Sequence, residues 1–203
     1  KTVVITGGSK VSDKLAVLKQ FVHTGVKAIF IGGKMVNSFL LAHNSKSKVK
    51  PFSISDIPGN LVSSSDDANH DLVNEVGLAA EILDLASYKT VDLIFPQDYK
   101  CVNEFNSKKY FIKKTPNFEK EIQLDLGPKT IENFRNTILS GGIENILWNG
   151  PLGAYDHPTN PDYIEGSLEL AKLLFEEAMT NKSFSVVIGG GDSAAILNKI
   201  GTN

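Results

Sequence analysis

Short runs of apolar residues alternate along the chain with segments of helical hydrophobic periodicity, and this alternation restricts the fold more than any other feature. Apolar strands of four or five residues, each followed by an amphipathic helix, require a parallel sheet that is covered on both faces. The sequence therefore predicts an α/β fold, a doubly wound, Rossmann-like parallel sheet in a three-layer α/β/α arrangement. The predicted strands are 2–5, 28–31, 91–95, 145–148 and 184–188, and the predicted helices are 11–22, 35–41, 71–86, 129–140, 164–179 and one that begins after 191.

Two stretches interrupt this alternation. Residues 44–70 are rich in Ser, Lys and Asp and contain Pro51, Pro58 and Gly59, which predicts an excursion on the surface. Residues 101–126 mix lysines with aromatic residues and predict a small antiparallel insert. Basic and aromatic residues together can bind nucleic acid, but the net charge of −2 favours a solvated surface.

Composition excludes several classes of protein. A net charge of −2 excludes a polycationic nucleic-acid binder, and no apolar run approaches the roughly 18 residues of a membrane-spanning helix. Cys101 is the only cysteine, so the chain has no internal disulfide, and a reducing, cytoplasmic location is expected. Because Lys1 already lies in a predicted strand and no leader precedes it, we expect the chain to be cut from a longer protein.

Three of the predicted strands end in glycines, at 7–8, 32–33 and 189–191. In an open parallel sheet, ligands bind beyond the carboxyl ends of the strands, where glycines allow close approach and helix N-termini offer N–H donors to phosphate. The alternative is that each pair only makes a tight turn from strand to helix. Neither G-x-G-x-x-G nor G-x-x-x-x-G-K-S/T is present, so phosphate would bind by another arrangement.

Charged and amide side chains follow these glycines. Lys10 and Lys14 are four residues apart and are expected on one face near a helix N-terminus, where two cations favour an anionic ligand over simple solvation. Asp192 can either cap the last helix or hold Mg²⁺ beside a phosphate. Asn149 precedes a rigid loop of two glycines and a proline, and its amide can face a ligand.

Taken together, residues 7–14 (GGSKVSDK), 148–153 (WNGPLG) and 188–194 (IGGGDSA) resemble signatures of the phosphoglycerate kinase family, in the same order. Residues 95–98 (FPQD) and 125–128 (DLGP) resemble two weaker elements. The resemblance covers nearly all of residues 1–203, but only the carboxyl-terminal, nucleotide-binding half of that family. It implies a glycolytic kinase that binds Mg-ADP/ATP, transfers a phosphoryl group between 1,3-bisphosphoglycerate and ADP, and is monomeric.

The resemblance also implies roles for individual residues. Lys10 would be catalytic and stabilise the phosphoryl group in transit, Lys14 would hold the nucleotide phosphates, and Asp192 would reach Mg²⁺. Asp156 would bind the ribose with a side chain one methylene shorter than the Glu of the family. The other implied nucleotide-binding residues are Gly8, Ser9, Gly33, Asn149 facing the terminal phosphate, Gly150, Pro151 and Leu152 lining the nucleoside, and Gly190, Gly191 and Ser193 donating to the phosphates.

The sequence also departs from the family. Lys34 and Gln123 stand where the family has glycine, and both bear on adenine affinity because they are expected beside the base. The family's 3-phosphoglycerate domain lies upstream and a further glycine-rich segment lies downstream, so we expect this chain to be inactive alone. The alternatives are a nucleotide-binding or interaction module that has lost catalysis and, less favoured without G-x-G-x-x-G, a dinucleotide- or S-adenosylmethionine-binding domain.

Overall fold

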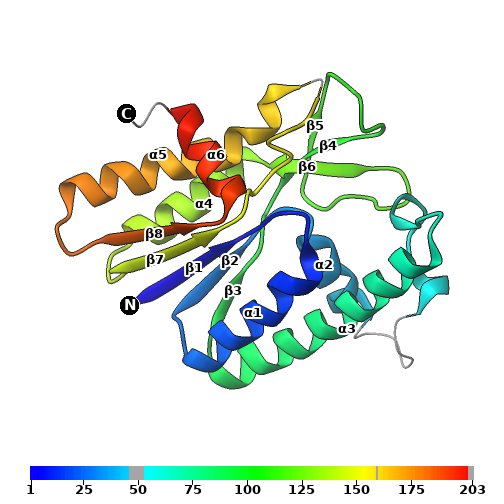
Figure 1. Ribbon diagram of the computed structural model, residues 1–203, viewed down its shortest axis with the longest axis horizontal. Coiled ribbons are helices and arrows are strands. Elements are labelled where there is room, and N and C mark those ends of the chain that lie inside the picture. Colours follow the sequence, from blue (N-terminus) through cyan, green and yellow to red (C-terminus); the bar gives the residue numbers. More distant parts are fainter. Residues whose placement is uncertain (46–52, 159, 201–203) are drawn as a thin grey trace.

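The computed structural model describes residues 1–45, 53–158 and 160–200, and it confirms the predicted α/β fold (Figure 1). A five-stranded sheet has the order β3-β2-β1-β7-β8, and every neighbouring pair in it is parallel. Its strands are β1 (Thr2–Thr6), β2 (Ala28–Ile31), β3 (Asp92–Ile94), β7 (Asn145–Asn149) and β8 (Ser185–Gly189). The helices are α1 (Val11–Thr24), α2 (Val36–Ser45), α3 (Asp66–Lys89), α4 (Pro128–Leu139), α5 (Glu165–Thr180) and α6 (Gly191–Ile200), with short 3₁₀ turns η1 (Ile54–Asp56), η2 (Gly59–Leu61) and η3 (Pro161–Ile164).

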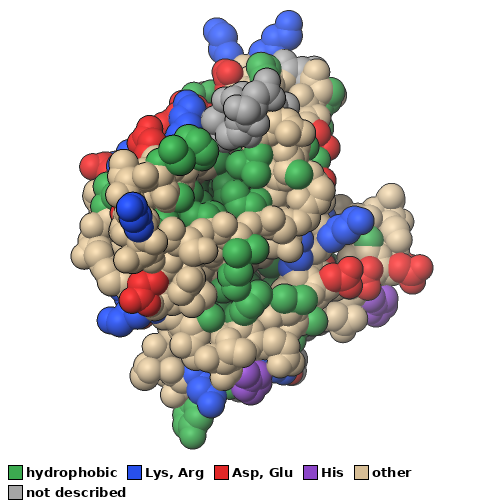
Figure 2. Space-filling view, turned by 60° about the vertical axis from the view of Figure 1, so that its left-hand side comes forward, with side chains coloured by type: hydrophobic (Ala, Val, Ile, Leu, Met, Phe, Trp, Pro, Cys, Tyr) green, Lys and Arg blue, Asp and Glu red, His purple; other side chains and the backbone are tan. Residues whose placement is uncertain are grey.

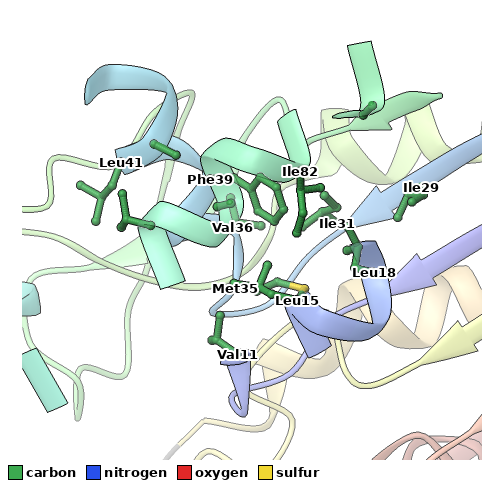
Figure 3. Packing of buried hydrophobic residues seen from close by; sticks show 14 of the residues in the cluster. Val11, Leu15, Leu18, Ile29, Ile31, Met35, Val36, Phe39, Leu41 and Ile82 are labelled. Atoms are coloured by element: carbon green, nitrogen blue, oxygen red, sulfur yellow. The ribbon is translucent and has the colours of Figure 1, made fainter. Parts of the chain in front are cut away.

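The two faces of the sheet bury alternate residues of each strand, as the two-residue period of a strand requires. Val4 of β1 packs in a cluster with α1, α2 and α3, whereas Val3 and Ile5 pack with α4, α5 and α6 (Figure 1). Figure 3 shows the first cluster, in which Phe39 of α2 and Ile82 of α3 lie close to β2. Each aliphatic side chain buried in this way stabilises the fold by about 1.5–3 kcal/mol.

Helix α3 is longer than its apolar pattern indicates. The prediction began the helix at 71, but it begins at Asp66, so the predicted excursion over 44–70 is wrong for residues 66–70. It is also wrong for Asn44 and Ser45, which form the end of α2. Ser65 is the N-cap and its side chain accepts a hydrogen bond from Ala68 N, while Asp66 and Asp67 lie at the positive end of the helix. Polar capping extends this helix where hydrophobic periodicity is absent. Of the rest of the predicted excursion, residues 46–52, with Pro51, lie outside the described part of the chain.

The predicted antiparallel insert is present as a second sheet of three strands, in the order β5-β4-β6. Its strands are β4 (Tyr99–Val102), β5 (Phe111–Lys113) and β6 (Ile122–Leu126). β4 is buried along its whole length. This sheet lies beyond the carboxyl ends of the central strands (Figure 1), so one of its strands, β6, can form a wall opposite the glycine loops.

One part of the central sheet stays accessible. Val187 of β8 is 58% exposed and Val17 of α1 is 55% exposed, beside a hollow of about 210 Å³. Figure 2 shows a face on which hydrophobic side chains gather in a hollowed central area with charged side chains around it. No helix within the described ranges is both long enough and apolar enough to cross a membrane.

Candidate functional site at the carboxyl edge of the sheet

The glycine loops at the carboxyl ends of β1, β2 and β7 are bonded to one another. Gly33 N donates to Leu152 O at 3.0 Å, and Lys34 N donates to Gly8 O at 3.2 Å. A Cβ on Gly7 would lie 2.1 Å from the carbonyl oxygen of Pro151, closer than any real contact. These glycines therefore do more than make tight turns: they allow three loops to pack backbone against backbone.

A cavity of about 610 Å³ lies between these loops and β6. Its size falls within the range typical of small-molecule sites. Several of the residues that the sequence predicted line it, together with others that were not predicted, of which only Gly153 lies in a motif that the sequence analysis identified. The predicted ones are Gly8, Ser9, Lys10, Gly33, Pro151, Leu152, Asp156 and Asp192, and the missed ones are Asn37, Leu61, Phe105, Phe118, Glu121, Ile122, Leu124, Gly153, Ala154 and Tyr155. Lys34 and Gln123, the departures from the family pattern, line it as well.

The remaining predicted residues lie next to the cavity and do not line it. Ser193 is fully buried, and its hydroxyl accepts a hydrogen bond from Gly150 N at 2.7 Å, which joins the loop after β7 to α6. Trp148 supports the same loop, since its indole Nε1 donates to Gly150 O at 2.8 Å. The residues in this outer group are Lys14, Asn149, Gly150, Gly190, Gly191 and Ser193.

The two lysines do not share one environment, which corrects the expectation from their spacing. Helix α1 begins at Val11, so Lys10 is its N-cap residue and its exposed side chain lines the cavity. Lys14 instead folds back under the loops, and its ammonium donates to Gly7 O. Burial lowers the pKa of Lys14, while the negative charge of Asp192 opposes that shift. Lys14 therefore supports the glycine loops within the electrostatic influence of Asp192, and Lys10 faces the open cavity.

Asp192 is the one predicted metal ligand. It lies in the first turn of α6, after the helix has begun at Gly191, so it does not act as the cap. Its carboxylate lines the cavity and accepts a hydrogen bond from the Tyr155 hydroxyl at 2.8 Å. No group of three or more His, Cys, Asp or Glu side chains suited to a metal occurs within the described ranges. A single carboxylate fits Mg²⁺ that takes its other ligands from phosphate oxygens and water.

A buried charge network lies below the cavity wall. Asp125 of β6 is completely buried, and its Oδ2 accepts a hydrogen bond from Gly166 N at 3.0 Å. Lys100 Nζ lies 3.7 Å from the same carboxylate and also pairs with Glu165 at the start of α5. Asp125 Oδ1 is the one buried side-chain oxygen or nitrogen of the described residues without a hydrogen bond. Burial raises the pKa of Asp125 to about 7, against the lowering effects of the Gly166 N–H and of Lys100.

This network predicts a pH-dependent stability. Because the folded Asp125 carboxyl binds its proton more tightly than the unfolded one, the free energy of unfolding decreases as pH rises from about 4 to about 7 and is level above that. Asp125→Asn removes this contribution. We subtract the free energy of unfolding of the unsubstituted chain from that of the variant, and we expect this difference to increase by about 1–3 kcal/mol between pH 5 and pH 8, measured by urea unfolding.

The exposed Asp92 of β3 offers a matched control. Asp92→Asn makes the same chemical change at the surface and measures the effect of losing a carboxylate as such. If the free energies of unfolding of Asp125→Asn and of the unsubstituted chain differ by the same amount at pH 5 and at pH 8, the raised pKa of Asp125 is contradicted.

Comparison with known proteins gives one consistent family. The sequence model of the family described as phosphoglycerate kinase matches residues 1–203. The phosphoglycerate kinase of Thermosipho africanus is 35% identical over 98% of this chain and 44% of its own length, and that of Dictyoglomus turgidum is 33% identical over 98% and 43%. The structure of phosphoglycerate kinase from Coxiella burnetii superposes with a TM-score of 0.73 at 25% identity, covering 98% of this chain and 44% of that one. The chain thus spans less than half the length of the curated relatives it matches.

Proposed function

The chain belongs to the phosphoglycerate kinase family, and we propose that it is the carboxyl-terminal, nucleotide-binding domain of a kinase that transfers a phosphoryl group reversibly between 1,3-bisphosphoglycerate and ADP. The observation that supports this most is the polarity of the cavity. One end has Lys10 and, in the first turn of α6, Asp192, while the walls toward β6 carry Leu61, Phe118 and other apolar side chains together with Glu121 and Gln123. A nucleotide has the same division between charged phosphates and a flat base.

In this proposal each end of the cavity does a different part of the binding. The N-termini of α1 and α6 present N–H donors and a positive dipole end to the phosphates. Lys10 faces the terminal phosphate from the open side, and Lys14 acts from below through the glycine loops. Asp192 would hold Mg²⁺, which neutralises phosphate charge when bound. The remaining nucleotide contacts are assigned to Gly8, Ser9, Gly33, Asn149, Gly150, Pro151, Leu152, Gly190, Gly191, Ser193 and, at the ribose, Asp156.

Phosphoryl transfer relies on positioning and charge stabilisation, with little covalent participation by the protein. A lysine on the open side of the cavity meets this need, because its ammonium can follow the phosphoryl group as it moves between donor and acceptor. Within the described residues the Lys10 ammonium makes no hydrogen bond or ion pair, so it is available for that purpose. We propose that 3-phosphoglycerate binds to the part of the parent protein outside residues 1–203, and that residues 1–203 alone bind nucleotide without turnover.

Nucleotide binding is tested most directly by thermal unfolding with Mg·ADP. A ligand at 100 times its dissociation constant adds about 2.7 kcal/mol to stability, and a chain of this size gains about 2–4 °C in Tm per kcal/mol. We therefore expect Mg·ADP near saturation to raise Tm by about 5–10 °C. Mg²⁺ with adenosine, which lacks the phosphates, should have little effect.

Two variants distinguish the effect of Mg²⁺ binding on Tm from the effect of removing a negative charge near a helix N-terminus. Asp192→Asn should reduce the additional stabilisation that Mg²⁺ gives beyond ADP alone. Asp13→Asn is the matched control, because Asp13 also lies in the first turn of a helix at this edge of the sheet. It should leave the Mg²⁺ effect unchanged. A Tm that stays constant up to millimolar Mg·ADP would contradict the nucleotide site and favour an interaction module with the same fold.

A further inference from the structure

The side chain of Gln123 connects the small sheet to the second glycine loop across the wall of the cavity. Its amide Nε2 donates to Gly33 O at 2.9 Å and to Asn37 Oδ1 at 3.1 Å. A carboxamide nitrogen has two hydrogens, so both are used. Because the amide is planar, fixing both N–H bonds also fixes the direction of its carbonyl oxygen, Oε1. The side chain of Gln123 is therefore fixed in one orientation by two hydrogen bonds.

Gln123 lies on the β6 wall of the cavity, where apolar side chains line the cavity together with Glu121. Its neighbours on β6, Ile122 and Leu124, line the same cavity, as does Phe118. The charged groups proposed for the phosphates, Lys10 and Asp192, belong to the helix starts at the carboxyl edge of the central sheet. In ligand sites an apolar surface binds the body of the ligand while a few polar groups fix its orientation. Gln123 and Asn37 are such polar groups at the end that suits a base.

Each of these two amides keeps one unused hydrogen-bonding group. Among the residues that the structure describes, Gln123 Oε1 accepts no hydrogen bond and Asn37 Nδ2 donates none. One acceptor and one donor therefore remain on the same wall. Adenine presents an amino donor beside a ring-nitrogen acceptor, which is the arrangement that Asn and Gln carboxamides recognise. Hypoxanthine carries a carbonyl oxygen in place of that amino group.

We propose that Gln123 is a specificity-determining residue that selects adenine by accepting a hydrogen bond from its amino group, with Asn37 donating to the adjacent ring nitrogen. This inference rests on the proposed function, because it needs the nucleotide to place its base against β6. Hypoxanthine has a carbonyl oxygen in place of the amino group. Two hydrogen-bond acceptors, this oxygen and Gln123 Oε1, would then face each other, and Gln123 Oε1 would have no donor. Sites that present a hydrogen-bonding group reject ligands that cannot complete the bond more strongly than apolar pockets do.

The test compares Mg·ADP with Mg·IDP by isothermal titration calorimetry on residues 1–203. We expect the parent chain to bind Mg·ADP about tenfold more tightly than Mg·IDP, since one such hydrogen bond accounts for that factor. Gln123→Leu keeps the bulk and removes the amide, so the ratio should fall to about 1. Gln20→Leu is the matched control: it makes the same chemical change at an exposed position of α1 outside the cavity lining and should keep the tenfold ratio.

The outcomes are distinct. Equal affinity for the two nucleotides in the parent chain would overturn the proposal for Gln123 while nucleotide binding itself still stood, and this measurement needs no variant to fold. A tenfold ratio that persists in Gln123→Leu would also overturn it. If neither nucleotide binds the parent chain, both this inference and the proposed function fail.

Discussion

Replacing Lys10 by Ala in the full-length parent protein is expected to lower kcat by about 10²–10³-fold while changing Mg·ADP affinity little. The reason is its position. Lys10 is exposed at the cavity and lies just before the first turn of α1, whereas the proposed phosphate site also includes the helix N-termini and the glycine loops. An interaction that becomes strong only as charge moves onto the transferring group raises kcat and leaves ground-state binding almost unchanged.

Lys14→Ala is the comparison variant, because its loss is expected to affect nucleotide binding and stability as well as kcat. The Lys14 ammonium is half-buried, bonds to Gly7 O and experiences the charge of Asp192. Its loss should weaken Mg·ADP binding and lower Tm as well, because the loops lose a common partner. Steady-state kinetics, calorimetry and thermal unfolding on both variants separate these effects. A near-normal kcat in Lys10→Ala would remove Lys10 from catalysis.

The second large effect is expected on stability, from Gly150→Ala. Gly150 has a φ of +91°, and a Cβ there would lie 2.1 Å from Lys14 Nζ and 2.3 Å from Gly7 O. The substitution thus combines a strained backbone with a collision inside the packed loops. We expect it to lower the free energy of unfolding by about 3 kcal/mol or more, which corresponds to a fall in Tm of about 6–12 °C.

A substitution at Gly141 measures the backbone strain without the collision, so comparing the two variants gives the effect of the collision. Its φ is +86°, nearly the same as that of Gly150, but a Cβ there meets no atom within 4 Å. Gly141→Ala should cost only about 1 kcal/mol, the conformational contribution alone. Equal destabilisation of the two variants in urea unfolding would show that the glycine loops are not packed as tightly as described.

The fold was predictable because its determinants are local and periodic. Strands such as Ala28–Ile31 are wholly apolar and end in glycines, so a sheet covered on both faces was the natural solution. The start of α3 was missed for the opposite reason. Its first residues are Ser65, Asp66 and Asp67, which favour a helix N-terminus through capping and the helix dipole and carry no hydrophobic period.

The candidate site was predictable only in part. Lys10, Asp192 and the glycines belong to short motifs beside strand ends, and those motifs indicate chemistry. Leu61 and Phe118, by contrast, come from segments without such a pattern and reach the cavity through tertiary packing. The spacing of Lys10 and Lys14 suggested a shared helix face, but α1 begins one residue after Lys10, and Lys14 turns under the loops. Spacing alone does not locate the first residue of a helix.

The hydrogen bond between the Trp148 indole and Gly150 O has a spectroscopic consequence. Trp148 is the only tryptophan in the sequence, and it is 1% exposed. Its indole is joined to the same peptide segment that Ser193 connects to α6. Emission excited at the red edge of tyrosine absorption therefore originates at one known point beside the cavity. The molecule carries an intrinsic optical reporter there, and ligand-induced movement of the loop after β7 can be followed in real time without any dye.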